Sequence, residues 1–212
     1  MRGRARSDAG GDVGSTKFAR NSAAGDNVSG PRAALREAAV PAVCQFLIFG
    51  TTLAAWPSIP GAACALGGFH SLGQGWWLDL VVGIYNAMDF AARLHLPRLQ
   101  RAARRSNGRA TLTACGTRVL LIPLIYLCVQ PRLVGGALGN ATILIAVALL
   151  ALSNGFLATL SMMQLPRAPP SLAEDAVNIA VAMLYLGLAT GATVSWAVGT
   201  YAMRLGEIHC PG

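Results

Sequence analysis

Three polar residues interrupt the second half of a largely apolar stretch near the middle of the chain, residues 76–94. Asn86, Asp89 and Arg93 are spaced so that, in a helix, all three lie on one face. A carboxylate accepts hydrogen bonds, a guanidinium donates them and an amide does both, so this face is suited to binding a polar molecule. Because charged groups are costly at bilayer depth, their presence there indicates a functional site.

The alternative is a purely structural role. Asp89 and Arg93 are four residues apart, which is the spacing of an ion pair within one helix, and such a pair also stabilises helix packing. Asn86 favours the functional interpretation, because it extends the polar face in a way that an ion pair alone does not require.

The composition is that of a membrane protein. Of the 212 residues, 54% are hydrophobic and 12% are charged, and the apolar residues gather in runs close to the length that a helix needs to cross a bilayer. In lipid such runs must be helical, and their weak period-two alternation argues against a β-barrel. We therefore expect an all-α polytopic membrane protein. The net charge of +8 does not point to nucleic acid, because membrane topology explains where the basic residues lie.

The apolar runs predict five transmembrane helices. Their approximate bounds are 38–58, 76–94, 117–130, 141–165 and 175–199. Residues 1–37 contain almost no apolar residue and are predicted to form a disordered basic cytoplasmic tail, with a transit peptide as the alternative. Residues 200–212 are predicted to form a short extracytoplasmic tail.

The distribution of Lys and Arg predicts the orientation. Seven of these residues lie in the tail 1–37 and six in the loop 95–118, whereas the loop 59–75 has none. The positive-inside rule therefore places the N-terminus in the cytoplasm and, after five spans, the C-terminus outside. We expect the plasma membrane rather than an organelle.

Prolines and glycines predict where the spans end, bend and touch. Trp56-Pro57 is expected to end the first span, and Pro123 is expected to kink the third. Gly187 and Gly191 lie four residues apart in the fifth span, a pattern that lets two helices approach closely.

The sequence does not indicate a cofactor, a metal site or an enzyme. The five cysteines have no CxxC spacing and no His at ligand spacing, so they are interpreted as unpaired packing residues. His70, His95 and His209 fall in loops or tails without a suitable partner. The chain also contains no Gly-rich phosphate loop, nucleophile elbow or zinc motif.

Five short segments together resemble one family. Residues 85–93, YNAMDFAAR, look like an aromatic-Asn-x-x-Asp-x-x-Gly-Arg motif, and the other four are Trp56-Pro57, Arg118–Leu124 followed by Cys128, Ser153–Ala158, and Leu186–Ala192 followed by Ser195. In this order they resemble transmembrane helices seven to eleven of the equilibrative nucleoside transporters. The resemblance covers about residues 40–199 and implies the C-terminal half of a major-facilitator-like six-plus-five transporter.

The resemblance also implies roles for individual residues. Asp89 and Arg93 would face a central cavity and contact a nucleoside, on the face that Asn86 extends. Trp56 would lie near the base, with an interfacial anchor as the alternative, and Leu188 would line the cavity, with helix packing as the alternative. By contrast, Asn154 and Gly155 are expected to hold the fourth predicted helix against a neighbour rather than to contact substrate.

Two departures from the family pattern stand out. Ala92 occupies the position beside Arg93 where the family usually has Gly, which affects close packing there. The first six helices, which supply about half of the family's substrate pocket, have no counterpart here. We therefore expect a partial or truncated member, with a missing N-terminal half or a second copy as its partner.

The leading interpretation is a nucleoside or nucleobase transporter of the equilibrative type, working by alternating access within a lipid bilayer. The first alternative is a non-transporting five-span remnant that acts as an assembly partner or regulator, which the missing half favours. A membrane-embedded enzyme is the third, and it is weakly supported, because an Asp–Arg pair without a nucleophile or metal cluster offers little chemistry.

Overall fold

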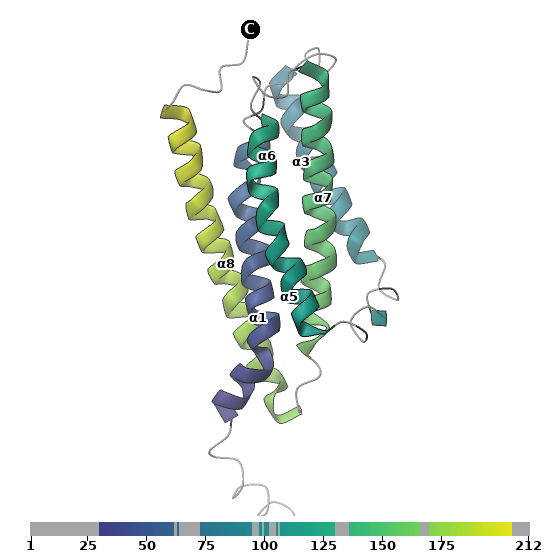
Figure 1. The fold of residues 1–212 in the computed structure, drawn as a ribbon, viewed down its shortest axis with the longest axis vertical. Helices are drawn as coiled ribbons and strands as arrows, with labels where there is room; N and C mark the ends of the chain where they lie inside the picture. The colour runs from purple at the N-terminus through teal and green to yellow at the C-terminus, as the bar shows by residue number, and fades with distance from the viewer. Residues whose placement is uncertain are drawn as a thin grey trace, which may run out of the picture.

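A computed structural model describes residues 30–61, 63, 73–94, 98, 100–101, 105, 107–129, 136–165 and 170–204 as a bundle of helices (Figure 1). Most of the two predicted tails, residues 1–29 and 205–212, lies outside the described residues. The three histidines do as well.

The first helix, α1 (Gly30–Ala55), begins before the predicted residue 38. Arg32 and Arg36, expected in the tail, are therefore exposed side chains on its first turns. The helix ends immediately before Trp56-Pro57, as predicted, because proline disfavours the helical conformation of the preceding residue. A single turn, α2 (Ser58–Gly61), follows.

The helix with the polar face is α3 (Gly73–Leu94), whose 22 residues are enough to cross a bilayer. Trp77 and Val81 bury one side of it against the bundle, whereas Asn86 and Arg93 are exposed on the other side. The bundle therefore covers the apolar side of α3 and leaves its polar side open.

The third predicted span is longer than expected and is interrupted. It comprises α5 (Gly108–Thr117), a 3-10 turn called η2 (Arg118–Leu120) and α6 (Leu121–Val129). The prediction that residues 108–116 form a loop was wrong: Asn107 caps α5 by accepting a hydrogen bond from the backbone N–H of Arg109. The interruption lies just before Pro123, whose ring conflicts with the carbonyl of Val119, four residues earlier.

The last two helices also begin before their predicted bounds, and the last one ends beyond its predicted bound. α7 (Gly136–Met162) replaces the predicted span 141–165, and α8 (Pro170–Arg204) replaces 175–199. Hydropathy detects only the part of a helix that matches the hydrocarbon core, and the helix itself continues into the headgroup region. Pro170 suits the first position of α8, where a missing N–H costs nothing.

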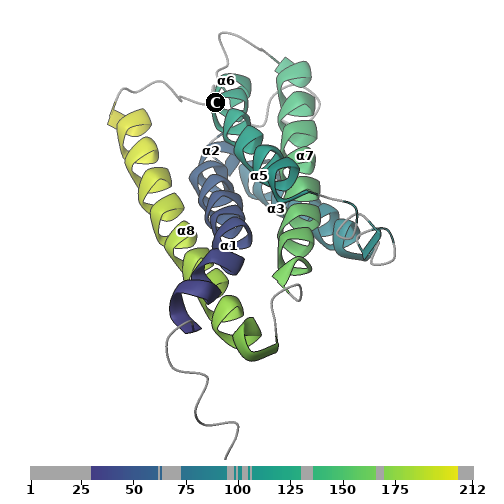
Figure 2. The same ribbon diagram turned by 60° about the horizontal axis from the view of Figure 1, so that its bottom comes forward.

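The helices are arranged around α1. In Figures 1 and 2, α8 runs along one side of α1, α7 lies on the other side, and α3 lies beyond α7. The segment α5–η2–α6 crosses in front of α1 and α7 in the view of Figure 1 and packs against both. α1 and α7 therefore form the middle of the bundle, and α3 and α8 form its outer edges.

Glycines allow α8 to pack directly on the backbone of α1. A Cβ added to Gly187 would lie 2.6 Å from the Phe46 carbonyl oxygen, and one added to Gly191 would lie 2.5 Å from the Gly50 carbonyl oxygen. Both distances are shorter than real Cβ contacts, so only glycine fits without a shift of the helices. The predicted close approach through Gly187 and Gly191 is confirmed.

This packing makes a stability prediction. Gly191→Ala is expected to destabilise the bundle by about 1–3 kcal/mol, because its methyl group would overlap the backbone of α1. Gly199→Ala on the same helix is the matched control, since an added Cβ there meets nothing within 4 Å. Thermal unfolding of both purified variants in detergent measures the difference, and equal melting temperatures would contradict the packing.

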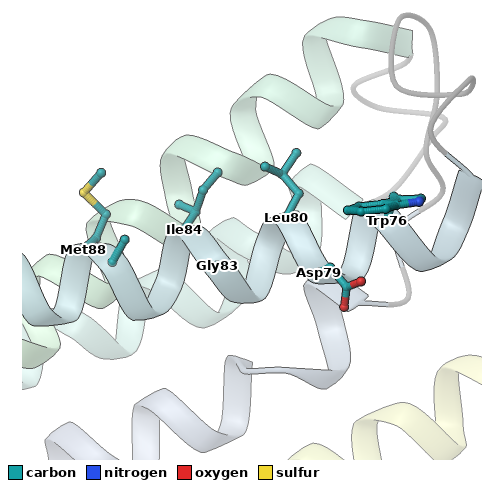
Figure 3. A pocket seen from close by; sticks show the side chains of 7 residues that line it. Trp76, Asp79, Leu80, Gly83, Ile84 and Met88 are labelled. Atoms are coloured by element: carbon teal, nitrogen blue, oxygen red, sulfur yellow. The ribbon is translucent and has the colours of Figure 1, made fainter.

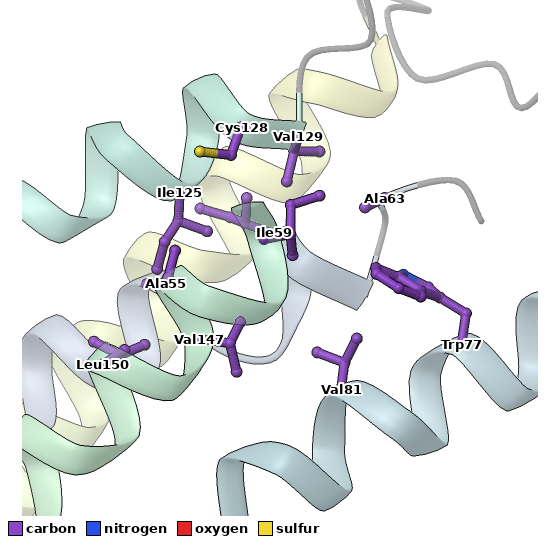
Figure 4. Close-up of a cluster of buried hydrophobic side chains, with 12 residues drawn as sticks. Ala55, Ile59, Ala63, Trp77, Val81, Ile125, Cys128, Val129, Val147 and Leu150 are labelled. Atoms are coloured by element: carbon purple, nitrogen blue, oxygen red, sulfur yellow. The ribbon is translucent and has the colours of Figure 1, made fainter. Parts of the chain in front are cut away.

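One cluster of buried side chains joins α3 to the rest of the bundle. Figure 4 shows Ile59, Trp77, Val81, Ile125 and Val147 around a common centre, contributed by α2, α3, α6 and α7. A second cluster joins α1, α5 and α7, and a third joins α1, α7 and α8. The position of α3, and of the polar residues that it carries, is therefore fixed mainly by α7 and by the turn after α1.

The outer surface is apolar, as expected for a protein in lipid. Large side chains such as Leu127, Ile145 and Trp196 are exposed. Among the described residues, four helical segments are both long and apolar enough to cross a membrane: 32–61, 108–129, 139–162 and 172–201. α3 is long enough but less apolar because of its charged and amide side chains. The chain is an all-α polytopic membrane protein.

Candidate functional site

The centre of the candidate site is an ion pair on α3. The Nε of Arg93 donates to Asp89 Oδ2 at 2.9 Å, and its Nη2 donates to Asp89 Oδ1 at 3.2 Å. This is the two-pronged geometry that a guanidinium and a carboxylate favour. The side chain of Arg93 is 41% exposed and that of Asp89 is 20% exposed. The pair expected from the sequence spacing is therefore present, and its open side is polar.

A second helix holds the same carboxylate. Asn154 on α7 is buried, and its Nδ2 donates to Asp89 Oδ1 at 2.8 Å. Its Oδ1 accepts from the hydroxyl of Thr52 on α1 at 2.9 Å. Asp89 is thus the point where α3 and α7 meet through polar groups. The sequence interpretation of Asn154 as a contact between helices agrees with this position, although it did not identify Asp89 as the partner.

Gly155 explains how α3 comes so close to α7. A Cβ at this position would overlap the backbone oxygen of Asp89 and lie 3.0 Å from the Cβ of Ala92. Ala92, which stands where the family usually has Gly, is buried against this glycine. The close approach of the two helices therefore depends on Gly155 in α7, and the methyl group of Ala92 is accommodated.

Arg118 contradicts its predicted position. The orientation count placed it in a cytoplasmic loop, but it is only 3% exposed, in the 3-10 turn inside the bundle. Its guanidinium donates hydrogen bonds to four oxygens. They are Ser153 Oγ at 3.0 Å, the Ile48 carbonyl oxygen at 3.1 Å, Thr52 Oγ1 at 3.0 Å and the Leu150 carbonyl oxygen at 3.2 Å. The sequence signals for this were its place in the predicted span 117–130 and at the start of the segment Arg118–Leu124, but the start of an apolar run equally suits an interfacial charge.

The predicted base-side residue, Trp56, lies next to the same part of α3. Its ring stacks on that of Tyr85, with centroids 4.6 Å apart and an angle of 11° between the planes. Tyr85 comes one helical turn before Asp89, so the stacked pair connects the turn after α1 to the polar side of α3. The sequence interpretation quoted Tyr85 within the motif but gave it no role.

The remaining two predicted residues lie apart from these contacts. Asn86 is exposed on α3, and no described hydrogen bond joins its side chain to the cluster. Leu188 is half-buried on α8, the helix that packs along the far side of α1. The described residues thus bring Asp89 and Arg93 together with Asn154 and Thr52, but they do not bring Leu188 to the same place.

A hollow of about 550 Å³ lies beside the ion pair on α3 and does not include it. Its lining is mostly apolar and comes from one helix: Trp76, Asp79, Leu80, Gly83, Ile84, Ala87 and Met88. In Figure 3 Leu80, Ile84 and Met88 project from one side of α3, whereas Asp79 projects from the other side. The hollow is an open groove along an outer helix. Neither it nor the ion pair is enclosed by the described residues.

The chemistry available at this site is hydrogen bonding. A carboxylate held by Asn154 and a partly exposed guanidinium offer an acceptor and donors on one surface. Within the described part of the chain, no group of three or more His, Cys, Asp or Glu residues is placed to hold a metal ion. Such a surface suits a polar ligand with both donors and acceptors.

Comparisons with known proteins show which family the chain is similar to. A family model described as nucleoside transporter matches residues 11–200. Nucleoside transporter 2 of Leishmania donovani is 32% identical over 160 residues, which are 74% of this chain and 29% of that protein. Nucleoside transporter 2 of Crithidia fasciculata is 28% identical over 160 residues, again 74% of this chain and 29% of the relative.

The chain therefore spans less than a third of the length of these two relatives. No solved structure matches it. The five short segments, from Trp56-Pro57 to Leu186–Ala192, predicted the family from the sequence, and that prediction is confirmed. The chain belongs to the nucleoside transporter family.

Proposed function

We propose that this chain carries one wall of the substrate site of a nucleoside transporter of the equilibrative type. Both curated relatives are named nucleoside transporters, which supports nucleosides as the substrate class. The sequence contains no motif for ATP hydrolysis, which agrees with movement down a gradient. The transport step would be alternating access around a site near the middle of the membrane.

In this proposal the polar side of α3 recognises the nucleoside. Asp89 accepts hydrogen bonds from ribose hydroxyls, Arg93 donates to the sugar or the base, and Asn86 extends the same surface. Trp56, stacked on Tyr85, provides an aromatic edge for the base. Leu188 would contact substrate only if α8 moves during the transport cycle, because it lies on the far side of α1.

The observation that carries the proposal is the exposure of the ion pair. Asn86 is exposed near the middle of α3, and Arg93, in the last turn of the helix, is 41% exposed beside Asp89, so this polar surface would be costly to place against hydrocarbon. A covering protein wall with a polar cavity between the two parts removes that cost. We infer that α3 crosses the membrane in addition to the four apolar segments, and that its polar side faces such a cavity.

The covering wall would be an N-terminal part of the transporter or a second copy of this chain. The length of the relatives favours an N-terminal part, because more than two thirds of each lies outside the region that matches. We place the N-terminus in the cytoplasm and the C-terminus outside, in the plasma membrane. Removing Arg118 from the loop count still leaves five basic residues between 95 and 117, so the positive-inside argument is unchanged.

Uptake measurements test this function. Transporter-deficient cells expressing the chain are given radiolabelled adenosine or uridine, with and without the N-terminal part of a full-length relative. Saturable uptake in either arrangement is the expected result. If correctly inserted protein gives no uptake in both arrangements, the transport proposal is wrong.

The alternative is a five-span protein that does not transport and instead assembles with or regulates another membrane protein. The short match to the relatives favours it, since one wall alone does not enclose a substrate. Absence of uptake together with co-purification of a membrane partner would support this alternative. The retained Asp89–Arg93 pair argues for transport.

A further inference from the structure

Arg118 is a buried cation whose place in the fold needs a reason. It lies inside the third span, and its guanidinium meets two backbone carbonyls and two hydroxyls. Among the described residues it forms no direct ion pair, although the Asp89 carboxylate lies near enough to interact with it electrostatically. Burying a charge without a direct ion pair is costly even when its donors are satisfied. The hydrogen bonds that Arg118 donates suggest what its burial achieves.

A series of hydrogen bonds connects Arg118 to Asp89 through Thr52 and Asn154, and in each of them the donor is on the Arg118 side. A carboxylate only accepts, so Asn154 must present its Nδ2 to Asp89, and its Oδ1 then faces Thr52. The Thr52 hydroxyl must therefore donate to Asn154, and its oxygen accepts from Arg118 Nη2 at 3.0 Å. We call Arg118, Thr52 and Asn154 the relay.

Arg118 also favours this direction at a point where it could fail. The single hydroxyl hydrogen of Thr52 has a competing acceptor in its own helix, the Ile48 carbonyl at 2.7 Å, and the Thr52 hydroxyl also lies within hydrogen-bond reach of the Tyr85 hydroxyl, which has a hydrogen of its own to donate. Arg118 Nη1 donates to that same carbonyl at 3.1 Å. Because the competing oxygen already has a donor, the Thr52 hydrogen is favoured toward Asn154.

We propose that Arg118 is a positioning residue that acts on Asp89 through Thr52 and Asn154, so that Asp89 stays oriented when Arg93 turns to substrate. Arg93 is the more exposed member of the ion pair and can leave it, whereas Asn154 is buried and stays. The carboxylate then presents its remaining acceptor sites in a fixed direction. This inference rests on the proposed nucleoside site, and it assigns part of substrate affinity to residues that do not contact substrate.

The relay is tested at Thr52, because replacing Arg118 would strip donors from four buried acceptors and is expected to unfold the bundle. Thr52→Val removes the hydroxyl and keeps the shape, and Thr52→Ser keeps the hydroxyl. Each is made in the wild-type and the Asp89→Asn background. The Kd for adenosine and for uridine is measured in whichever assembly supports uptake.

Thr52→Val removes the hydrogen bonds that Thr52 makes with Arg118 and Asn154, so Asn154 is no longer held in line with Asp89. It is expected to raise Kd about tenfold, the size of one aligned hydrogen bond to the Asp89 carboxylate, and Thr52→Ser is expected to stay within about twofold of wild type. In the Asp89→Asn background Thr52→Val is expected to change Kd by less than about twofold. A tenfold loss of similar size in both backgrounds would mean that Thr52 acts elsewhere. Failure of Thr52→Ser to restore affinity would equally overturn the relay.

Failure of the proposed function gives a different result. If wild-type protein neither takes up nor binds nucleosides, the transport proposal falls, and thermal unfolding of the same variants tests the relay itself. The relay predicts that Thr52→Val lowers the melting temperature more in the wild-type background than in the Asp89→Asn background. Equal shifts in the two backgrounds would contradict it.

Discussion

Asp89→Asn is expected to lower nucleoside uptake at least about 100-fold. The carboxylate accepts two hydrogen bonds from Arg93 and one from Asn154, so it meets three donor groups. An amide has one acceptor oxygen and one NH₂ group, so at least one of these donors would face another donor. The loss of one hydrogen bond to a charged acceptor, at about 1.5–3 kcal/mol, together with the weakening of the other two when the acceptor loses its charge, accounts for this magnitude.

Asp79→Asn is the matched control for this variant. It makes the same chemical change on the same helix. Asp79 is exposed and lines the hollow, and it is not part of the ion pair. Uptake of radiolabelled adenosine is compared at equal surface expression of the two variants. Near-normal uptake by Asp89→Asn, or an equal loss in Asp79→Asn, would contradict a specific role for Asp89.

Gly155→Ala is expected to weaken both stability and uptake. Its methyl group would overlap the Asp89 backbone oxygen and would force α3 away from α7. Overpacking of this kind costs about 1–3 kcal/mol, and the separation would lengthen the bond from Asn154 to Asp89. We therefore expect a lower melting temperature together with at least about a tenfold loss of uptake in the fraction that folds.

Gly83→Ala provides the comparison. Gly83 is in the same membrane bundle and in the middle of α3, where an added Cβ meets nothing within 4 Å. Alanine favours a helix over glycine, so this variant is expected to be at least as stable as wild type. Unfolding in detergent and uptake in cells are measured for both variants, and a Gly155→Ala protein that behaves like Gly83→Ala would refute the tight contact.

Features set by spacing within one helix could be predicted from the sequence. The Asp89–Arg93 pair follows from a separation of four residues, and the end of α1 follows from Trp56-Pro57. The close glycine contact of α8 follows from the spacing of Gly187 and Gly191, but that spacing does not identify α1 as the partner helix. Periodicity says which residues share a face but not what that face touches.

Contacts between distant segments could not be predicted in the same way. Arg118 and Thr52 are 66 residues apart, and Asn154 and Asp89 are 65 residues apart, so no local pattern connects them. A basic residue at the edge of an apolar run is more typical of the membrane interface, and the orientation count therefore included Arg118. Arg118 is instead buried within the bundle, in the 3-10 turn that precedes Pro123.

Whether water reaches the polar side of α3 can be measured directly. Asn86→Cys is treated with a membrane-impermeant thiol reagent, in the assembly that supports uptake and with parent-chain labelling subtracted. Ile145→Cys on α7, at an exposed apolar position, is the control for a side chain that faces lipid. We predict that Asn86→Cys reacts, that adenosine slows the reaction, and that Ile145→Cys stays unlabelled. If Asn86→Cys is as unreactive as Ile145→Cys, or if adenosine leaves its labelling unchanged, α3 does not line a nucleoside cavity.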